Sequence, residues 1–272
     1  MRWLILHSAT RHGFDGRVPG EDYLMPRPWS DDAALYWVRH AESTANLADI
    51  AAHENNAGRI ELTHRDPDVP LSDAGREQAQ SLGSAWRDTP VAERPTVVIS
   101  SPYERALQTA QLALAAAEWK LPLLRDERVR ERELGLVDGY TQAGIKEQFP
   151  QEAERRKWVG KFYYRPPGGE NWADVAGRVR SLLAEIANNG ENERVLLVTH
   201  QAVILLARYV LEDLTEQEIL EVDRTDRLAN TAVTRYEADA GSWRLVSYND
   251  TGHLDNRAAP ETDEPDAAAV AQ

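Results

Sequence analysis

The chain has 272 residues, a formal net charge of −14 at pH 7 and no cysteine. This length suffices for one large α/β domain with a sizeable core, or for two small domains. The acidic excess argues against general affinity for nucleic acid or for an anionic membrane surface, but it does not exclude a local basic pocket for an anionic substrate. Without cysteine there is no disulfide, no thiolate metal site and no cysteine nucleophile, which excludes the cysteine phosphatases.

No apolar run approaches the roughly 20 residues that cross a bilayer. Residues 1–8 carry one arginine and too short an apolar stretch for a signal peptide, so we expect a cytoplasmic protein. Residues 1–34 combine the apolar run Trp3–Leu6 with a stretch rich in Gly, Pro and Asp, and are expected to form an N-terminal extension. Residues 255–272 are dominated by Asp, Glu, Pro and Ala, and are expected to be a disordered acidic tail.

From residue 35 onward, patterns typical of strands and helices alternate. Short apolar or β-branched runs predict buried strands at Leu35–Trp37, Thr96–Ile99, Leu121–Leu124 and Arg194–Val198. Helical patterns lie between and after them, at 43–53, 72–86, 102–117, 141–149, 171–187, 201–211 and 215–220. Segments 231–236 and 243–248 are expected to pair as a hairpin. The alternation predicts an α/β fold, a three-layer α/β/α sandwich with a mostly parallel central sheet, over residues 35–254.

Three of the predicted strands end in side chains that suit anion chemistry. Arg39–His40 follows the first, Ser100–Ser101 with Arg105 just beyond follows the second, and Thr199–His200 follows the last. A helical pattern comes directly after each, so helix N-termini should converge with these side chains at one edge of the sheet. Guanidinium groups suit phosphate oxygens, and imidazole supplies a nucleophile or a cationic donor near neutral pH. The pattern predicts a phosphoryl-binding pocket with His40 as the nucleophile.

Simpler roles exist for each of these residues taken singly. A lone histidine at a strand end is more often a structural residue, and Arg105 could be an ordinary surface arginine. Recurrence of the same placement after three strands favours a shared pocket. A second pair, Arg11–His12, ranks below Arg39–His40, because residues 7–10 separate it from the nearest apolar run and no helix start follows it.

A phosphoryl transfer from an alcohol oxygen also needs a proton donor for the leaving group. The segment from Val129 to Gly139 supplies two candidates, Glu131 and Glu133. A carboxyl group in a partly dry pocket has a raised pKa, which suits proton donation. Charge spacing alone does not choose between the two, or between either of them and a solvated, salt-bridged loop.

Five motifs in this order resemble those of the histidine phosphatase superfamily, also called phosphoglycerate mutase-like. Segment 39–46, Arg-His-Ala-Glu-Ser-Thr-Ala-Asn, is similar to its Arg-His-Gly-Glu-x-x-x-Asn signature. The other matches are Pro-Leu-Ser-Asp-Ala-Gly-Arg-Glu-Gln-Ala at 70–79, Ser-Ser-Pro-Tyr-Glu-Arg-Ala-Leu-Gln-Thr-Ala at 100–110, Glu-x-x-x-Gly-x-x-x-Gly at 131–139 and Val-Thr-His at 198–200. The resemblance covers about residues 35–248 and selects Glu131 over Glu133.

The resemblance implies a phosphoglycerate mutase-like fold and a metal-independent, acid-type histidine phosphatase with no organic cofactor. It implies that His40 becomes phosphorylated and that Glu131 donates a proton to the leaving group. It also implies that the phosphoryl oxygens are held by Arg39, Asn46, Arg105 and His200. The chain departs from the family at Ala41 and Gln201, where glycine is commoner. Neither change removes a catalytic group, so we expect an active enzyme.

The region after the acid motif bears on the reaction. Cofactor-dependent glycolytic mutases of this superfamily carry a long proline-rich insertion there, and its absence here favours a phosphatase over a phosphoglycerate-type mutase. The region looks like the bisphosphatase domain of the bifunctional fructose-2,6-bisphosphate enzymes, in which Lys161 and Gln201 match sugar-phosphate contacts. A solvated basic helix face is an equally good interpretation of Lys161. Leu205 stands where that family has an arginine and Trp172 where it has a tyrosine, and these 272 residues hold no counterpart of its kinase domain.

We therefore expect a phosphomonoester hydrolase for a small phosphorylated metabolite, such as a sugar phosphate. The partner is the substrate itself, with no nucleic acid and no membrane, and the sequence does not specify an oligomeric state. One alternative is a metal-dependent aspartate phosphatase built on Asp66-Pro67-Asp68, although no buried strand precedes that pair. A second alternative is a non-catalytic protein that binds a phosphorylated ligand.

Overall fold

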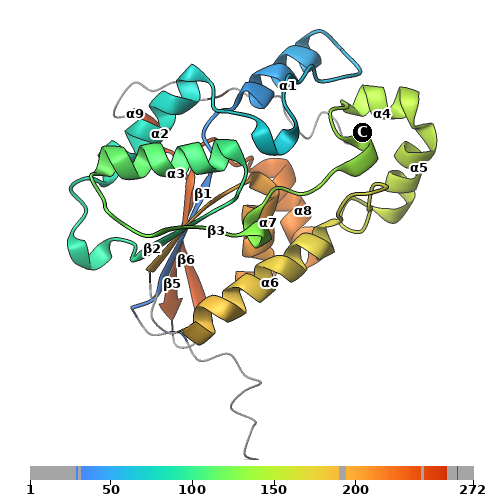
Figure 1. Ribbon diagram of the computed structural model, residues 1–272. Helices are drawn as coiled ribbons and strands as arrows, with labels where there is room; N and C mark the ends of the chain where they lie inside the picture. Colours follow the sequence, from blue (N-terminus) through green and yellow to red (C-terminus); the bar gives the residue numbers. More distant parts are fainter. Residues whose placement is uncertain (1–28, 30–31, 190–193, 240–241, 256–261, 263–272) are drawn as a thin grey trace, which may run out of the picture.

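The computed structural model describes residues 29, 32–189, 194–239, 242–255 and 262, and these form a sheet between layers of helices (Figure 1). Within them the sheet has six strands in the order β3-β2-β4-β1-β5-β6. Strands β1 to β4 run parallel, β5 pairs antiparallel with β1, and β6 pairs antiparallel with β5. Their bounds are Ala34–Arg39 (β1), Val97–Ser100 (β2), Leu123–Arg125 (β3), Arg194–Thr199 (β4), Val233–Asp239 (β5) and Ser242–Asp250 (β6).

The register of the parallel strands brings their carboxyl ends together. Arg39 at the end of β1 lies opposite Thr199 at the end of β4. Ser100 at the end of β2 lies opposite Val198 of β4. The residues that follow these strands therefore share one edge of the sheet, as expected for ligand sites in parallel α/β sheets.

Alternating side chains of the central strands enter two hydrophobic cores on opposite faces of the sheet. In β4, Val195 and Leu197 pack into one core, and Leu196 and Val198 into the other. The first core lies under α6, α7 and α8, and the second under α2 and α3 (Figure 1). The helices are α1 (Thr44–Glu54), α2 (Asp73–Trp86), α3 (Glu104–Ala117), α4 (Gln142–Gln148), α5 (Pro150–Val159), α6 (Trp172–Asn189), α7 (Gln201–Leu211), α8 (Glu216–Thr225) and α9 (Gly252–Asp255).

The predicted three-layer α/β/α sandwich is confirmed, as is the hairpin of β5 and β6. The last predicted helix is longer than expected and ends at Thr225. Helix α5 was not expected. It buries none of its side chains, so its sequence lacks the apolar periodicity that predicts a helix. The expected extension (residues 1–34), the pair Arg11–His12 and the expected tail (255–272) lie almost wholly outside the described residues and stay predictions. No helix in the described part of the chain is long and apolar enough to cross a membrane.

Contact between α2 and α3 depends on a glycine. An ideal Cβ placed on Gly83 would lie 2.0 Å from the carbonyl oxygen of Ala113 and 2.8 Å from its Cα, and both are backbone atoms that cannot rotate away. We expect Gly83→Ala to lower the free energy of unfolding by roughly 1–3 kcal/mol, because the two helices must separate.

Denaturant unfolding followed by circular dichroism measures this change. Gly177 is the matched control, since it is an exposed residue of α6 whose added Cβ would meet nothing within 4 Å. Gly177→Ala should instead stabilise by up to about 1 kcal/mol, because alanine is the better helix former. Equal effects of the two substitutions would refute the packing argument.

Candidate active site

His40 lies directly after β1, at the edge where the strand ends meet. Its backbone N–H donates to the carbonyl of Thr199 at 2.8 Å, and only 4% of the residue is exposed. Its ring Nδ1 lies 2.8 Å from the carbonyl oxygen of Ala41. Because a carbonyl oxygen only accepts, the hydrogen of the neutral ring belongs on Nδ1 and the lone pair on Nε2. In this tautomer Nε2 carries a lone pair that is able to attack an electrophile.

Two polar side chains fix the backbone around His40. Asn230 donates from Nδ2 to the carbonyl oxygen of His40 at 2.8 Å. Thr109 Oγ1 accepts from the N–H of Ala41 at 3.0 Å and donates to the carbonyl of Arg105 at 2.7 Å. One buried hydroxyl therefore ties the segment that carries His40 to the helix that carries Arg105.

His200 follows β4 and is fully buried beside His40, with the ring centroids 5.1 Å apart. Its Nε2 lies 2.8 Å from Ser101 Oγ, so the tautomer with hydrogen on Nδ1 lets the serine hydroxyl donate to Nε2. Nδ1 is buried and has no hydrogen-bond partner among the described residues. An unpaired buried donor is costly, so the Nδ1–H of His200 is available to donate to a bound anion.

Arg39 and Arg105 place two buried guanidinium charges near these rings. Arg39 ends β1 and donates from Nη1 to the carbonyl of Leu228, and Arg105 lies in the first turn of α3. They are 6% and 5% exposed. Burial lowers the pKa of His40 and His200 well below the usual range, and the charges of Arg105 and Arg39 lower it further. Both rings are therefore neutral near pH 7, as a histidine nucleophile requires.

Glu131 faces the histidines from the loop after β3. One of its carboxylate oxygens accepts from the N–H of Arg132 at 2.7 Å, and the other lies 3.8 Å from His200 Nδ1. Burial raises the pKa of Glu131, against the lowering effects of the Arg132 N–H and of Arg105. Glu133 is exposed and accepts from the N–H of Gly135 at 3.1 Å. The geometry thus sets Glu131, and not Glu133, beside the second histidine.

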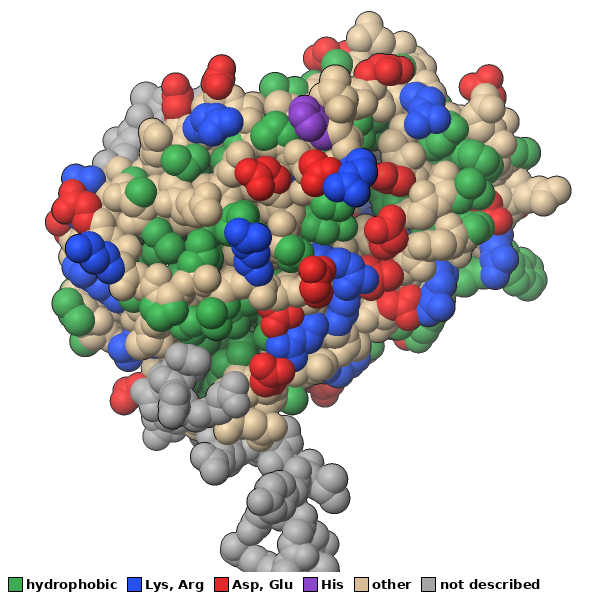
Figure 2. All heavy atoms as spheres, viewed as in Figure 1, with side chains coloured by type: hydrophobic (Ala, Val, Ile, Leu, Met, Phe, Trp, Pro, Cys, Tyr) green, Lys and Arg blue, Asp and Glu red, His purple; other side chains and the backbone are tan. Residues whose placement is uncertain are grey.

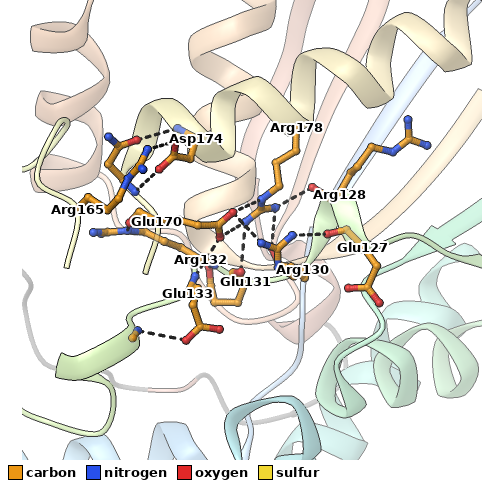
Figure 3. Close-up of polar contacts among 12 residues, drawn as sticks. Glu127, Arg128, Arg130, Glu131, Arg132, Glu133, Arg165, Glu170, Asp174 and Arg178 are labelled. Carbon is orange, nitrogen blue, oxygen red and sulfur yellow. Dashed lines mark hydrogen bonds and ion pairs between the residues drawn. The ribbon is translucent and has the colours of Figure 1, made fainter. Parts of the chain in front are cut away.

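Arg178 of α6 organises the loop that carries Glu131 (Figure 3). Its Nη1 donates to the carbonyls of Arg128 and Arg130 at 2.8 and 3.0 Å, and its Nη2 to the carbonyl of Glu131 at 3.2 Å. Both oxygens of the Glu170 carboxylate accept from the same guanidinium at 2.9 Å. The planar fork of arginine can bind carbonyls and a carboxylate at once, which holds the loop that carries Glu131 against α6.

Asn46 and Gln201 lie at helix starts near the two histidines. Asn46 Oδ1 accepts from both the N–H and the hydroxyl of Ser43 at 2.8 Å, so its side-chain oxygen closes the capping box of α1. Gln201 is the first residue of α7, half-buried and next to His200. Asn46 therefore supports the backbone that follows His40 through its own hydrogen bonds to Ser43.

Lys161 lies farther out, between α5 and α6. Its Nζ forms an ion pair with the buried carboxylate of Asp223 on α8, and lies 5.2 Å from the ring centroid of Trp172. About a third of the side chain remains exposed. In this arrangement the charge of Lys161 is already balanced within the fold.

The sequence profile of the histidine phosphatase superfamily (branch 1) matches residues 35–251, which include every residue of this cluster. The chain belongs to the histidine phosphatase superfamily. The resemblance drawn from the five motifs is thereby confirmed. No three His, Asp or Glu side chains gather as a metal-binding group in the described part of this histidine phosphatase.

Known proteins resemble this chain over most of its own length. Phosphoglycerate mutase-like protein 4 of Arabidopsis thaliana is 28% identical over 226 residues, which cover 83% of this histidine phosphatase and 88% of that protein. The 6-phosphofructo-2-kinase/fructose-2,6-bisphosphatase of Gallus gallus is 31% identical over 186 residues, which cover 68% of this chain but only 34% of that larger protein. A mycobacterial glucosyl-3-phosphoglycerate phosphatase in complex with VO3 superposes with a TM-score of 0.62 at 26% identity, covering 80% of this chain and 98% of that one.

Sequence reasoning missed the polar residues that support the site of this histidine phosphatase. They are Thr109, Arg132, Arg178 and Asn230, whereas Ser101 follows the second predicted strand and was expected at this edge of the sheet. Thr109 lies within the motif 100–110, so its proximity could have drawn attention. Arg178 and Asn230 stand 47 and 190 residues from the groups whose carbonyls they bind, and no local pattern marks them.

Proposed function

We propose that this protein hydrolyses phosphomonoesters of a small phosphorylated metabolite, such as a sugar phosphate, through a phosphohistidine at His40. The observation that carries the proposal is the pair of buried imidazoles with ring centroids 5.1 Å apart, in which the Nδ1 of His40 is bound to a backbone carbonyl and Nε2 is left to attack. Superfamily membership supports a phosphatase, and the mycobacterial neighbour is a phosphatase by name. The described face in Figure 2 mixes acidic and basic side chains, which fits a small substrate better than a polyanion.

The reaction proceeds in two steps. His40 Nε2 attacks phosphorus, the N–P bond forms as the P–O ester bond breaks, and Glu131 gives its proton to the departing alcohol oxygen. Arg39, Arg105 and the Nδ1–H of His200 stabilise the charge on the phosphoryl oxygens. A water molecule then attacks phosphorus and passes a proton to the Glu131 carboxylate, while the N–P bond breaks and its electron pair returns to His40 Nε2. Inorganic phosphate leaves, and both residues return to their starting forms.

A cavity behind the proton-donor loop suits the remainder of the substrate. It has a volume of about 150 Å³ and is lined in part by Arg132, Gln142, Arg156 and Tyr164. Burial lowers the pKa of both arginines, and the charge of Arg156 lowers that of Arg132 further. Two guanidinium groups against one carboxylate, that of Glu152, favour a polar or anionic group, while Leu134, Val137 and Ile145 add an apolar wall. This lining supports a sugar phosphate over a wholly apolar ester. Lys161 and Gln201 are proposed to contribute at the outer rim, with Lys161 exchanging Asp223 for the substrate.

The pH profile should be that of an acid-type phosphatase. Because the pKa of His40 is lowered, the nucleophile stays neutral below pH 6.5, and because the pKa of Glu131 is raised, the donor keeps its proton above its usual range. We expect kcat/KM for an alkyl phosphate to peak on the acidic side of neutrality and to fall as Glu131 ionises. The fall should be weaker for an aryl phosphate, whose leaving group needs less protonation. A kcat/KM that rises through pH 7 for both esters would contradict the assignment.

A panel of phosphorylated metabolites tests the function directly. Wild-type protein should release inorganic phosphate from at least one class in the presence of EDTA, which also tests metal independence. Retention of the phosphoryl group on a second hydroxyl of the product would instead reveal a phosphoglycerate-type mutase. Binding without any phosphate release would indicate a phospholigand-binding protein.

A further inference from the structure

In the proposed phosphate pocket, the guanidinium group of Arg105 is paired with the carboxylate of Asp66. Its Nη1 donates to Asp66 Oδ1 at 2.8 Å and to the carbonyl oxygen of Asp66 at 2.7 Å. Asp66 begins the 3-10 turn Asp66–Asp68, and 30% of its side chain is exposed against 6% for that of Arg105. The remaining N–H groups of Arg105 bind no other described residue, so they are available to a phosphoryl group.

The negative charge of Asp66 shifts the pKa of two other groups near the pocket. It raises the pKa of Glu131 and of Tyr103, whose ring lies 5.2 Å from the guanidinium carbon of Arg105. A phosphoryl group bound to Arg105 therefore lies close to a negative charge that the mechanism does not use. Like charges at such short range, in a partly dry pocket, repel appreciably.

A pocket of two arginines, a histidine donor and converging helix N-termini would hold inorganic phosphate tightly. Tight product binding lowers the rate at which the enzyme becomes free for the next substrate. A fixed carboxylate beside Arg105 offsets part of this attraction. It also keeps the guanidinium oriented through Nη1 while its other N–H groups face the ligand.

We propose that Asp66 is a positioning residue that counters the charge of Arg105, weakens the binding of inorganic phosphate and so promotes product release. The proposal rests on the proposed phosphatase function. It gives Asp66 a part in the proposed site, different from the aspartate phosphatase considered from the sequence for Asp66-Pro67-Asp68.

The proposal is tested by whether the Kd of inorganic phosphate falls or rises in the Asp66→Asn variant. Asparagine keeps an oxygen that accepts from Arg105 but removes the negative charge. We expect the Kd of inorganic phosphate, measured by titration calorimetry, to fall about tenfold, and KM to fall with it while kcat does not rise. A merely structural role would do the opposite, because a misplaced Arg105 binds phosphate more weakly.

Asp68→Asn is the matched control. It changes the same charge in the same turn, but Asp68 pairs at 2.6 Å with Arg65, whose side chain is 81% exposed, so we expect no change in phosphate affinity. A Kd in Asp66→Asn that is unchanged or raised overturns the proposal, and so does an equal fall in Asp68→Asn. Tighter phosphate binding by Asp66→Asn in a protein that hydrolyses no ester would support the counter-charge while rejecting the phosphatase function.

Discussion

His40→Ala should lower kcat for every phosphomonoester substrate by at least about 10³-fold, because it removes the nitrogen that we propose forms the N–P bond. The same variant should fail to acquire a phosphoryl group when mixed with an aryl phosphate and quenched at alkaline pH, where phosphohistidine persists. Intact-protein mass spectrometry measures this directly. Wild-type protein, by contrast, should show a fraction with one added phosphoryl group.

The matched control for this prediction is His53→Ala. His53 lies on α1, is 28% exposed in its side chain and contacts Asp49 of the same helix, so its loss should leave labelling and kcat within about twofold. Activity that survives His40→Ala but disappears in EDTA would overturn the phosphohistidine route. That result would favour the metal-dependent chemistry of an aspartate phosphatase.

Glu131→Gln should lower kcat/KM much more for substrates with a poor leaving group than for substrates with a good one. Without a proton donor an alkyl phosphate must expel an alkoxide, so kcat/KM should fall by about 10²–10⁴-fold. An aryl phosphate with an acidic phenol needs little protonation, and its kcat/KM should fall by less than about tenfold. We choose kcat/KM because it reports only the steps through phosphoryl transfer to His40, whereas kcat also includes the hydrolysis that Glu131 assists.

Glu133→Gln serves as the control for Glu131→Gln, since the two residues stand two positions apart in the same loop and Glu133 is exposed. We expect its kcat/KM for both esters to stay within about twofold of wild type. Equal losses on alkyl and aryl esters in Glu131→Gln would argue for a role in holding the phosphoryl group. A larger loss in Glu133→Gln would mean that the donor has been misassigned.

The alternation of strands and helices was readable from the sequence because it rests on local physics. Leu35–Trp37 and Val195–Val198 are apolar on both faces, as a strand buried between two helical layers must be. Parallel strands then place their carboxyl ends at one edge, so the meeting of His40, Arg105 and His200 followed from the order of elements alone. Helix α5 escaped prediction because it buries no side chain.

The choice among like residues needed the tertiary structure. Glu131 and Glu133 stand two positions apart with the same charge, and only the fold turns one toward His200 while the other lies exposed. Before the structure, that choice rested on resemblance. Likewise, the sequence offered Asp66 only as part of an alternative aspartate phosphatase motif, whereas in the fold its carboxylate pairs with Arg105.

The sequence by itself determined the fold class, the edge of the sheet that carries the chemistry and the residue types that meet there. Each of these depends on periodicity and on the direction of strands, which are local properties. The tertiary structure decided the tautomer of His40, the support of Glu131 by Arg178 and the counter-charge on Arg105. These depend on contacts between residues up to 47 positions apart, whose geometry is set only when the helices pack on the sheet.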